Sequence, residues 1–287
     1  MGGPSDERVI SLKSGRAVAR GLREAGYDVT EVDVVGRTVD LPAGTEAVFI
    51  ALHGEFGEDG GVQTILNERG VPYTGSGPVA SRAAFDKVIS KEVFIHSRIP
   101  TPAYQVFREG DTRRLPLPVV VKPARQGSSI GVSRVFRESE WDAALQTGFQ
   151  YCSELIVEAY VDGQELTVGI LGGEALPVIE IVAPDGDYSF AAKYTAGRTT
   201  YLVPAPLAAE VNARCQDLAL RTFEVLGCRG FGRVDLRLAP GGELFVLELN
   251  SIPGFTETSL LPKAAACAGL SFPALCHRIM NSAGNPA

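Results

Sequence analysis

The sequence predicts an α+β protein that alternates helix and strand near its N-terminus and forms hairpins further along. An amphipathic helix pattern at residues 11–25 precedes two apolar strand patterns at 28–34 and 47–52, which indicates a small parallel sheet. Later alternating runs are separated by Gly and Pro clusters, which is typical of antiparallel hairpins. The first strong break falls at residues 75–78, Gly-Ser-Gly-Pro, and we place a domain boundary there.

The composition is that of a globular protein with a sizeable core. A chain of 287 residues with 45% hydrophobic residues can hold one large or two to three small domains. The 34 acidic residues outnumber the 27 basic ones, which argues against general nucleic-acid binding. We expect no membrane span and no secretory signal, because no apolar run approaches the roughly 18 residues that a span needs. Five cysteines without CxxC spacing favour reduced thiols in a cytoplasm.

The N-terminal elements place one histidine at the end of a strand. Ser11 is the expected N-cap of the first helix, and Gly26 is its expected end. His53 follows the strand at 47–52, at the edge where open α/β sheets bind ligands. A lone histidine in this place can equally be structural. A short helix is expected at 62–69.

The central part combines one long helix with strands around a glycine- and serine-rich turn. The helix is expected at 78–97, strands at 117–122 and 132–136, and a helix at 141–147. The intervening turn, 123–131, can cradle phosphate with its N–H groups, or it is an ordinary hairpin loop. Another apolar strand at 155–161 is interrupted by Glu158, which is either an edge residue facing water or an acceptor for a ligand.

The last third is predicted to be a hairpin-rich sheet with helices. Strands are expected at 166–171 and 175–182, a long surface loop at 192–206 and a helix at 208–226. A loop of that length is a candidate lid. The end, 260–287, is expected to be helical with an unstructured tail.

A hairpin at 233–249 carries the clearest sign of a cation site. An even-numbered loop around residues 239–242 would put Asp235 and Glu248 on one face, beside Arg233 and Asn250. Carboxylate and amide oxygens at this spacing suit Mg²⁺. The alternative is a solvated strand face with an Arg–carboxylate pair. The opposite face should pack in the core through Val234, Leu236, Phe245, Leu247 and Leu249.

Eight motifs follow one another along the chain. They are GGPSDERVISLKSG (2–15), HGEFGEDG (53–60), FDK (85–87), VVVKPARQGSSIGVS (119–133), IVEAYVDGQELTV (156–168), AAKY (191–194), GFGRVDLRL (230–238) and LELNSIPGFTETSLLP (247–262). In this order they resemble the D-alanine–D-alanine ligases of the ATP-grasp superfamily over nearly the whole chain. The second and last motifs are specific to these ligases. The lysine strand and the paired carboxylates are shared by ATP-grasp enzymes generally.

The resemblance implies an ATP-grasp fold and a carboxylate–amine ligase. An N-terminal α/β (pre-ATP-grasp) domain at 1–75 would precede two α+β domains, 76–160 and 161–287, that clamp ATP. ATP would convert one D-alanine to an acyl phosphate, which the amine of a second D-alanine attacks to give D-alanyl-D-alanine for peptidoglycan. The expected cofactors are ATP and two Mg²⁺ ions, or Mn²⁺ in their place. A cytoplasmic homodimer is expected. The alternatives are a ligase for D-lactate, D-serine or another amino acid, and a catalytically silent nucleotide-binding protein.

The resemblance also assigns residues of this chain to the nucleotide and metal sites. Lys87, Lys122 and Ser129 would hold phosphates, and Glu158 would accept from the adenine amino group. Glu165 would bind the ribose hydroxyls. The remaining matches are Ala159, Tyr160 and Val161 around the adenine, and Asp235, Glu248 and Asn250 as metal ligands.

On the substrate side, the resemblance implies that Glu7 binds the ammonium of the first D-alanine, with Ser128 and Tyr194 as its hydrogen-bond partners. Arg233 and the Gly254 N–H would stabilise the oxyanion, although Arg233 can instead be the structural partner of Asp235. The other matches are His53 near the first carboxylate, Lys193 on the transferred phosphate, and Ser259 and Leu260 around the second carboxylate. A neutral phenol at Tyr194 suits an amine nucleophile.

One departure from the family concerns the start of the chain. Relatives have a full apolar strand before the loop that begins at Gly2, and here Met1 stands in its place. We therefore expect the neighbouring strands to expose their hydrogen-bonding edges.

Overall fold

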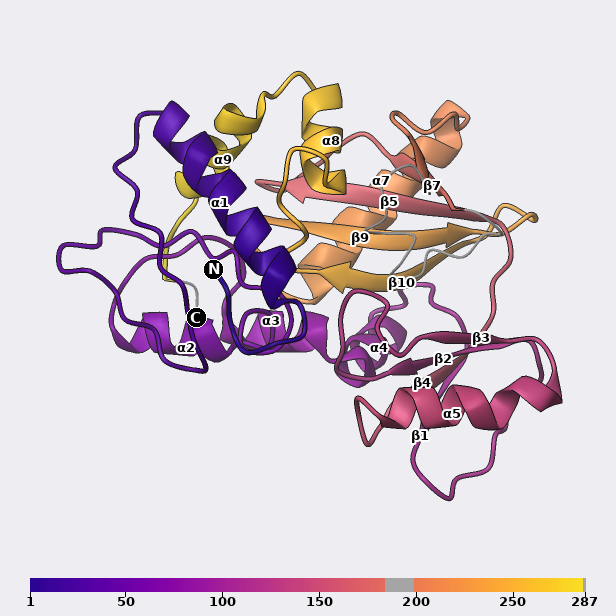
Figure 1. The fold of residues 1–287 in the computed structure, drawn as a ribbon. Coiled ribbons are helices and arrows are strands. Elements are labelled where there is room, and N and C mark those ends of the chain that lie inside the picture. The colour runs from indigo at the N-terminus through magenta and orange to yellow at the C-terminus, as the bar shows by residue number, and fades with distance from the viewer. Residues whose placement is uncertain (184–198, 286–287) are drawn as a thin grey trace.

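Two antiparallel sheets form the frame of the molecule (Figure 1). The computed structural model describes residues 1–183 and 199–285. The smaller sheet has the order β1-β4-β2-β3, and the larger has the order β10-β9-β5-β7-β8 with β6 beside β5. The smaller contains β1 (Tyr104–Phe107), β2 (Val119–Pro123), β3 (Ser133–Val135) and β4 (Leu155–Ala159). The larger contains β5 (Gln164–Leu171), β6 (Glu174–Ala175), β7 (Ile179–Val182), β8 (Thr200–Leu202), β9 (Phe231–Leu238) and β10 (Leu244–Asn250).

Helices cover the outer faces of both sheets. In Figure 1, α5 runs along the smaller sheet and α7 lies behind the larger one. The N-terminal helix α1 packs against α9, which comes from the other end of the chain. The helices are α1 (Arg8–Glu24), α2 (Gly61–Glu68), α3 (Pro78–Phe85), α4 (Lys87–His96), α5 (Trp141–Phe149), α7 (Ala209–Val225), α8 (Leu260–Cys267) and α9 (Phe272–Met280), with a 3₁₀ turn at η1 (Glu138–Glu140). Within the described ranges, no helix has the length and apolar character to cross a membrane.

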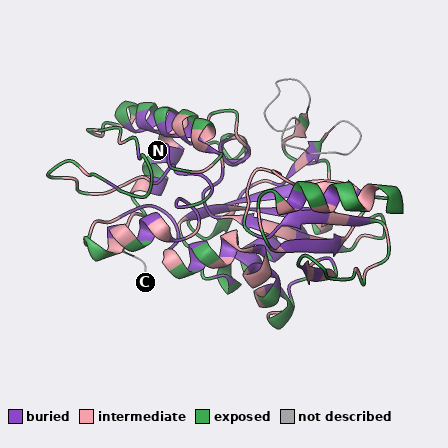
Figure 2. Ribbon diagram, turned by 60° about the horizontal axis from the view of Figure 1, so that its bottom comes forward, coloured by how far each residue is buried: buried purple, intermediate pink, exposed green. Residues whose placement is uncertain are grey.

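The core follows the strand alternation of the larger sheet. Leu166, Val168 and Leu236 are fully buried and pack in the same apolar cluster as Leu218 and Phe223 of α7. Burial is concentrated on the strands, whereas the outward faces of the helices are exposed (Figure 2). This packing fixes β9 and β10, and so fixes the polar face that they present on the opposite side.

The hairpin of β9 and β10 presents Asp235 and Glu248 on one face, as predicted, but for a different reason. Glu248 lies opposite Asp235, and Asn250 lies opposite Arg233. The loop between the strands is 239–243, an odd number of residues, so the prediction of an even loop is wrong. A β-bulge between Val246 and Glu248 inserts one extra residue and restores the pairing.

The same bulge corrects the predicted core face of β10. Val246 is fully buried and Leu244 nearly so, whereas Phe245 and Leu247 are only partly buried. The expectation that Phe245 and Leu247 face the core is therefore wrong. Because the extra residue shifts the alternation, Val246 and Leu249 both face inward.

The N-terminal sheet is less regular than predicted. The expected strands at 28–34 and 47–52 form only isolated parallel bridges, Gly2 with Val34 and Val48 with Tyr73. The parallel direction is as predicted, but the prediction of two regular strands is wrong. Their backbone groups bond to Met1–Gly3 on one side and to 72–74 on the other, and no recorded bond within the described ranges joins the two segments to each other.

A groove of about 610 Å³ lies between these two extended segments and against α1. Its apolar walls include Val18 and Leu22 of α1, and Val32 and Ile50 of the segments. Met1 lies at the groove, where its ammonium donates to the carbonyl of Val32 at 3.0 Å. Burial lowers the pKa of this ammonium.

Two helix predictions also need correction. The helix expected at 78–97 is two helices, because Asp86 has an extended backbone and caps α4 with its side chain, which accepts from the N–H of Val88 at 2.9 Å. The first helix begins at Arg8, so Ser11 is not its cap. Ser11 is fully buried, accepts from the Gly2 N–H and donates to the Ala51 carbonyl. Gly26 ends that helix with positive φ, as predicted.

Candidate active site

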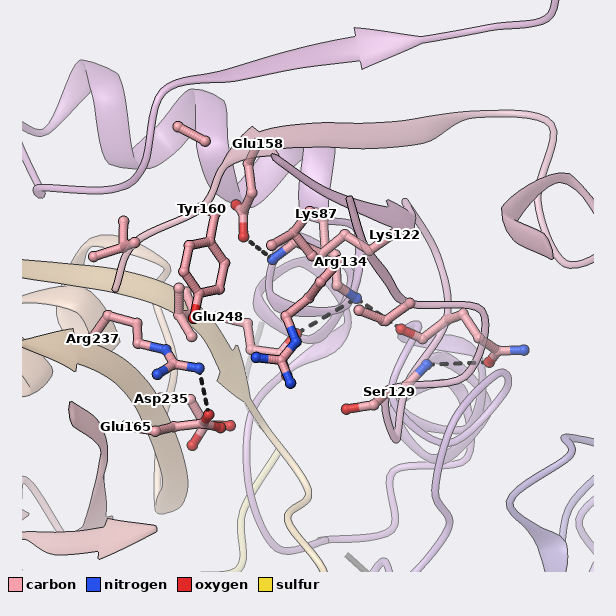
Figure 3. Close-up of a pocket in the computed structure, with 17 residues that line it drawn as sticks. Lys87, Lys122, Ser129, Arg134, Glu158, Tyr160, Glu165, Asp235, Arg237 and Glu248 are labelled. Carbon is pink, nitrogen blue, oxygen red and sulfur yellow. Dashed lines mark hydrogen bonds and ion pairs between the residues drawn. The ribbon is translucent and has the colours of Figure 1, made fainter. Parts of the chain in front are cut away.

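A pocket between the two sheets collects the residues that the sequence assigned to ATP (Figure 3). Its volume is about 130 Å³, and its walls come from α4, β2, β3, β4, β5, β9, β10 and the turn after β2. The predicted residues that line it are Lys87, Lys122, Ser129, Glu158, Ala159, Tyr160, Val161, Glu165, Asp235 and Glu248. They therefore include every predicted ATP contact and two of the three predicted metal ligands.

Ion pairs join several of the charged side chains that line this pocket. Lys122 pairs with Glu158, and Lys87 Nζ lies 3.6 Å from Glu248 Oε2. Burial alone would raise the pKa of Glu158, but the charges of Lys122 and Lys91 outweigh it and hold that pKa below its usual range. A bound triphosphate would have to replace these carboxylates as the partner of each lysine.

The oxygen cluster on the hairpin is chemically suited to a hard cation. Asp235 is buried, and both its oxygens accept from Arg233 at 2.8 Å. Thr167 Oγ1 and Asn250 Nδ2 also donate to it, at 2.6 and 3.1 Å. Within the described ranges no group of three His, Cys, Asp or Glu side chains could hold a metal; here the third oxygen comes from an amide. Two carboxylates and an amide fit Mg²⁺, and Asp235 already has Arg233 as a partner.

The turn after β2 reaches across to the N-terminal segment. Lys87 Nζ donates to the Gln126 carbonyl at 2.7 Å. Ser128 and Ser129 both have positive φ, 51° and 58°, a conformation that is costly for residues with a Cβ and that clusters at functional sites. The Ser128 hydroxyl donates to Glu7, as the sequence predicted for these two residues.

Glu7 lies in a narrow space bounded by backbone. It lies directly before the first residue of α1, and it is 5% exposed. A Cβ added to Gly54 or Gly127 would lie 2.7 or 2.5 Å from Glu7 Oε2. Only glycine lets the backbone come this close to the carboxylate, so the glycines of two motifs build the wall of this site.

The comparisons with known proteins agree with this geometry. Residues 92–281 match the family model "D-ala D-ala ligase C-terminus". The D-alanine–D-alanine ligase of Methylacidiphilum infernorum is 47% identical over 281 residues, which is 97% of this chain and 92% of that protein. That of Syntrophotalea carbinolica is 47% identical over 99% of this chain and 94% of its own length. The chain belongs to the D-alanine–D-alanine ligase family.

A solved structure supports the same assignment at the level of the fold. The D-alanine–D-alanine ligase from Bacillus anthracis, crystallised in complex with ATP, matches with a TM-score of 0.85 and 29% identity. The match covers 98% of this chain and 94% of the other. The predicted ATP-grasp fold is therefore confirmed.

In this ligase His53 connects the N-terminal helix to the loop that contains Gly254. Its Nδ1 lies 3.0 Å from the Ile252 carbonyl, and its Nε2 lies 2.9 Å from Ser14 Oγ. A carbonyl can only accept, so Nδ1 carries the proton and Nε2 accepts from Ser14. Ser14 Oγ in turn accepts from the Phe255 N–H. Both ring nitrogens are thus engaged inside the protein, which favours the structural alternative for His53.

The neutral state of His53 predicts a loss of stability in mild acid. Burial lowers its pKa to about 4, below the unfolded value near 6.5. The unfolded chain therefore binds the extra proton first, and stability falls as the pH drops from about 6.5 to 4, by up to about 3 kcal/mol. Chemical denaturation across this pH range measures the free energy of unfolding. The difference in that free energy between the wild type and His53→Gln should shrink by that amount as the pH falls. His96→Gln, at an exposed histidine, is the control, and parallel curves for wild type and His53→Gln would contradict the prediction.

The residues expected around the second substrate lie at the start of α8. Ser259 precedes Leu260, the first residue of that helix. The Ser259 hydroxyl accepts from the Thr256 N–H at 3.0 Å instead of capping α8. Gly254 lies close by, since a Cβ on it would be 3.4 Å from Ser259 Oγ. Lys193 and Tyr194 lie outside the described residues.

Several residues at these sites were missed by the sequence argument. Those that line the nucleotide pocket are Val120, Val132, Arg134, Arg237 and Leu247. Glu58 is buried and accepts from the Gly54 N–H at 2.8 Å, and its pKa is raised, first by burial and then by the charge of Glu7. Arg237 was detectable, because it lies two residues beyond Asp235 on the same strand face. Leu247 was not, because the bulge places it there.

Proposed function

We propose that this ligase joins two D-alanines in an ATP-dependent reaction through an acyl phosphate, as a cytoplasmic homodimer that uses Mg²⁺. The observation that carries the proposal is the meeting of three groups of residues around one pocket. The predicted ATP contacts line it, the oxygens of the β9–β10 hairpin border it, and Glu7 faces the turn between β2 and β3. Phosphoryl transfer depends chiefly on this kind of positioning and charge neutralisation.

Lys87 and Lys122 are the proposed phosphate ligands. Both are nearly buried, and each is paired with a carboxylate of the pocket. A polyphosphate offers stronger negative charge than either carboxylate, so its binding would draw both lysines toward it. Asp235, Glu248 and Asn250 would hold Mg²⁺, which supplies charge neutralisation at the transferred phosphate.

Glu7 is the proposed anchor for the ammonium of the first D-alanine. Its buried carboxylate is oriented by Ser128 and enclosed by Gly54 and Gly127. We assign the oxyanion to Arg233 and the Gly254 N–H. Ser259 and Leu260 begin α8, where backbone N–H groups and the helix dipole suit the carboxylate of the second D-alanine. His53 would support this region by holding the loop at 252–255.

Product formation with alternative second substrates tests the function. Release of ADP should require D-alanine and Mg²⁺, and D-alanine should be preferred to D-serine and D-lactate across pH 6–9. The resemblance implies that the neutral phenol of Tyr194 suits an amine nucleophile. A clear preference for D-lactate near neutral pH would reject the D-alanine assignment. Binding of ATP without any D-alanine-dependent turnover would instead identify a silent nucleotide-binding protein.

A further inference from the structure

A third buried lysine, outside the residues assigned above, lies behind the nucleotide pocket. Lys91 of α4 is 1% exposed. Its Nζ forms an ion pair with Glu158 Oε2 at 2.7 Å, while the other oxygen of Glu158 pairs with Lys122. The buried carboxylate is thus held between two ammonium groups, of which one lines the pocket and the other does not.

Lys91 also reaches the other sheet. Its Nζ donates to Thr101 Oγ1, and Thr101 Oγ1 donates to the Val246 carbonyl at 2.8 Å. The Val246 N–H donates to the Pro100 carbonyl at 2.7 Å. Residues 100–101 therefore cover the outer edge of β10 at Val246, where the bulge begins. A continuous polar chain runs from Glu158 through Lys91 and Thr101 to the strand that presents Leu247 and Glu248.

The two ammonium groups around Glu158 cannot have the same role if the proposed function holds. Lys122 would turn to the phosphate when nucleotide binds. Glu158 would then lose one of its two charge partners while remaining buried. An ionised carboxylate without a partner in such a place is strongly disfavoured and takes up a proton instead. Among the residues that the structure describes, Lys91 is the charged partner that stays beside it.

We infer that Lys91 is a positioning residue that keeps Glu158 as a fixed hydrogen-bond acceptor and thereby sets the preference for the nucleobase. This inference rests on the proposed assignment of Glu158 to the base. An ionised Glu158 can only accept, so it favours a base that presents an amino group and disfavours one that presents a carbonyl at the same position. A protonated Glu158 can donate to a carbonyl, and the discrimination is lost.

The expected effect of Lys91→Met is a change of selectivity and not only a loss of activity. The ratio of kcat/KM for ATP to that for GTP should fall at least about 30-fold, because a site built on hydrogen-bond complementarity loses its discrimination when the acceptor changes state. The KM for ATP should rise, and the KM for D-alanine should stay within about threefold. Lys91→Gln, which retains a donor for both partners, should lose less of the ratio than Lys91→Met.

Direct binding provides the readout that does not depend on turnover. Calorimetric titration with ADP and with GDP should show the same fall in the affinity ratio for Lys91→Met. If the wild type binds both nucleotides but has no D-alanine-dependent turnover, the proposed function fails, while the binding ratio still tests Lys91. Lys13→Met makes the same change at an exposed lysine of α1 and should leave both ratios at the wild-type value.

Two further variants show whether Lys91 acts through Glu158. In Glu158→Gln, the additional change Lys91→Met should alter the nucleotide ratio by less than threefold, since the group it positions is already gone. Thr101→Val, which keeps the ion pair, should leave the ratio near wild type. Equal losses of ADP and GDP binding in Lys91→Met, with an unchanged affinity ratio, would overturn the inference and leave Lys91 a structural residue. Circular dichroism confirms that each variant is folded, and Lys91→Gln carries the test if Lys91→Met is not.

Discussion

Glu248→Gln is expected to reduce kcat/KM for ATP by about 10³-fold, a loss of about 4 kcal/mol of transition-state stabilisation. The substitution keeps the size of the side chain but removes one charge from the oxygen cluster opposite Asp235. It also removes the partner of Lys87, whose Nζ lies 3.6 Å from Glu248. The concentration of Mg²⁺ needed for half-maximal rate should rise at least about tenfold, and initial rates over a Mg²⁺ series measure it.

The same hairpin supplies a matched control. Glu243 lies in the exposed loop between β9 and β10, so Glu243→Gln removes the same charge close by without touching the pocket. Its rate and Mg²⁺ dependence should remain those of the wild type. If both variants showed the same small loss, the effect would be one of net charge, and Glu248 would not be a metal ligand.

The hairpin also shows how far sequence alternation can carry a prediction. The prediction that Asp235 and Glu248 share one face is correct, because both lie on strands whose other face is buried. The reason given was wrong, since the loop is odd and a bulge compensates for it. A bulge depends on how β10 packs against α7 and on the edge contact from Pro100. Such contacts are distant in sequence, so no local pattern reveals Leu247 as a pocket residue.

In the N-terminal region, the hydrophobic pattern was not sufficient to predict the secondary structure. The apolar runs at 28–34 and 47–52 were predicted as strands of one parallel sheet, but each forms only a single parallel bridge, and that bridge is to another segment. A run becomes a strand only when a neighbour supplies a ladder of hydrogen bonds. Met1–Gly3 pairs with only the end of one run. The groove between the runs is therefore a property of the tertiary arrangement, which hydrophobic pattern alone does not give.

The partners of the charged residues were the least predictable part of the site. The family motifs named Lys122 and Glu158, but not the ion pair between them or the pair of Glu158 with Lys91. The pair of Arg233 with Asp235 was foreseen only as one of two alternatives. Lys91 lies in none of the identified motifs. It contacts Glu158 from behind the pocket and does not line the pocket itself. Its position one helical turn after Lys87 was the available signal, since residues four apart share a helix face.

Arg233→Met is expected to lower kcat by about 10²- to 10³-fold, while the KM for D-alanine changes by less than about threefold. This is the result for a guanidinium that stabilises an oxyanion formed only during the reaction. In the structure the same guanidinium holds both oxygens of Asp235 at 2.8 Å. A cation bound by Asp235 would compete for those oxygens and weaken the pair. Arg233 can therefore be the partner of Asp235 before the cation binds and the oxyanion donor afterwards. Steady-state kinetics with saturating ATP and Mg²⁺ measure the effect.

A comparison with Arg237→Met distinguishes a loss of catalysis from the loss of stability that follows when an ion pair is broken. Arg237 lies on the same face of β9, and its Nη2 is 2.9 Å from Glu165, so Arg237→Met also leaves a partly buried carboxylate without its partner. Both variants should lose stability, by up to about 3–5 kcal/mol if the pairs are fully buried, and thermal unfolding measures this. Arg237→Met should raise the KM for ATP and leave kcat within about threefold. If kcat falls equally in the two variants, Arg233 is only the structural partner of Asp235, because a lost ion pair alone would then account for both results.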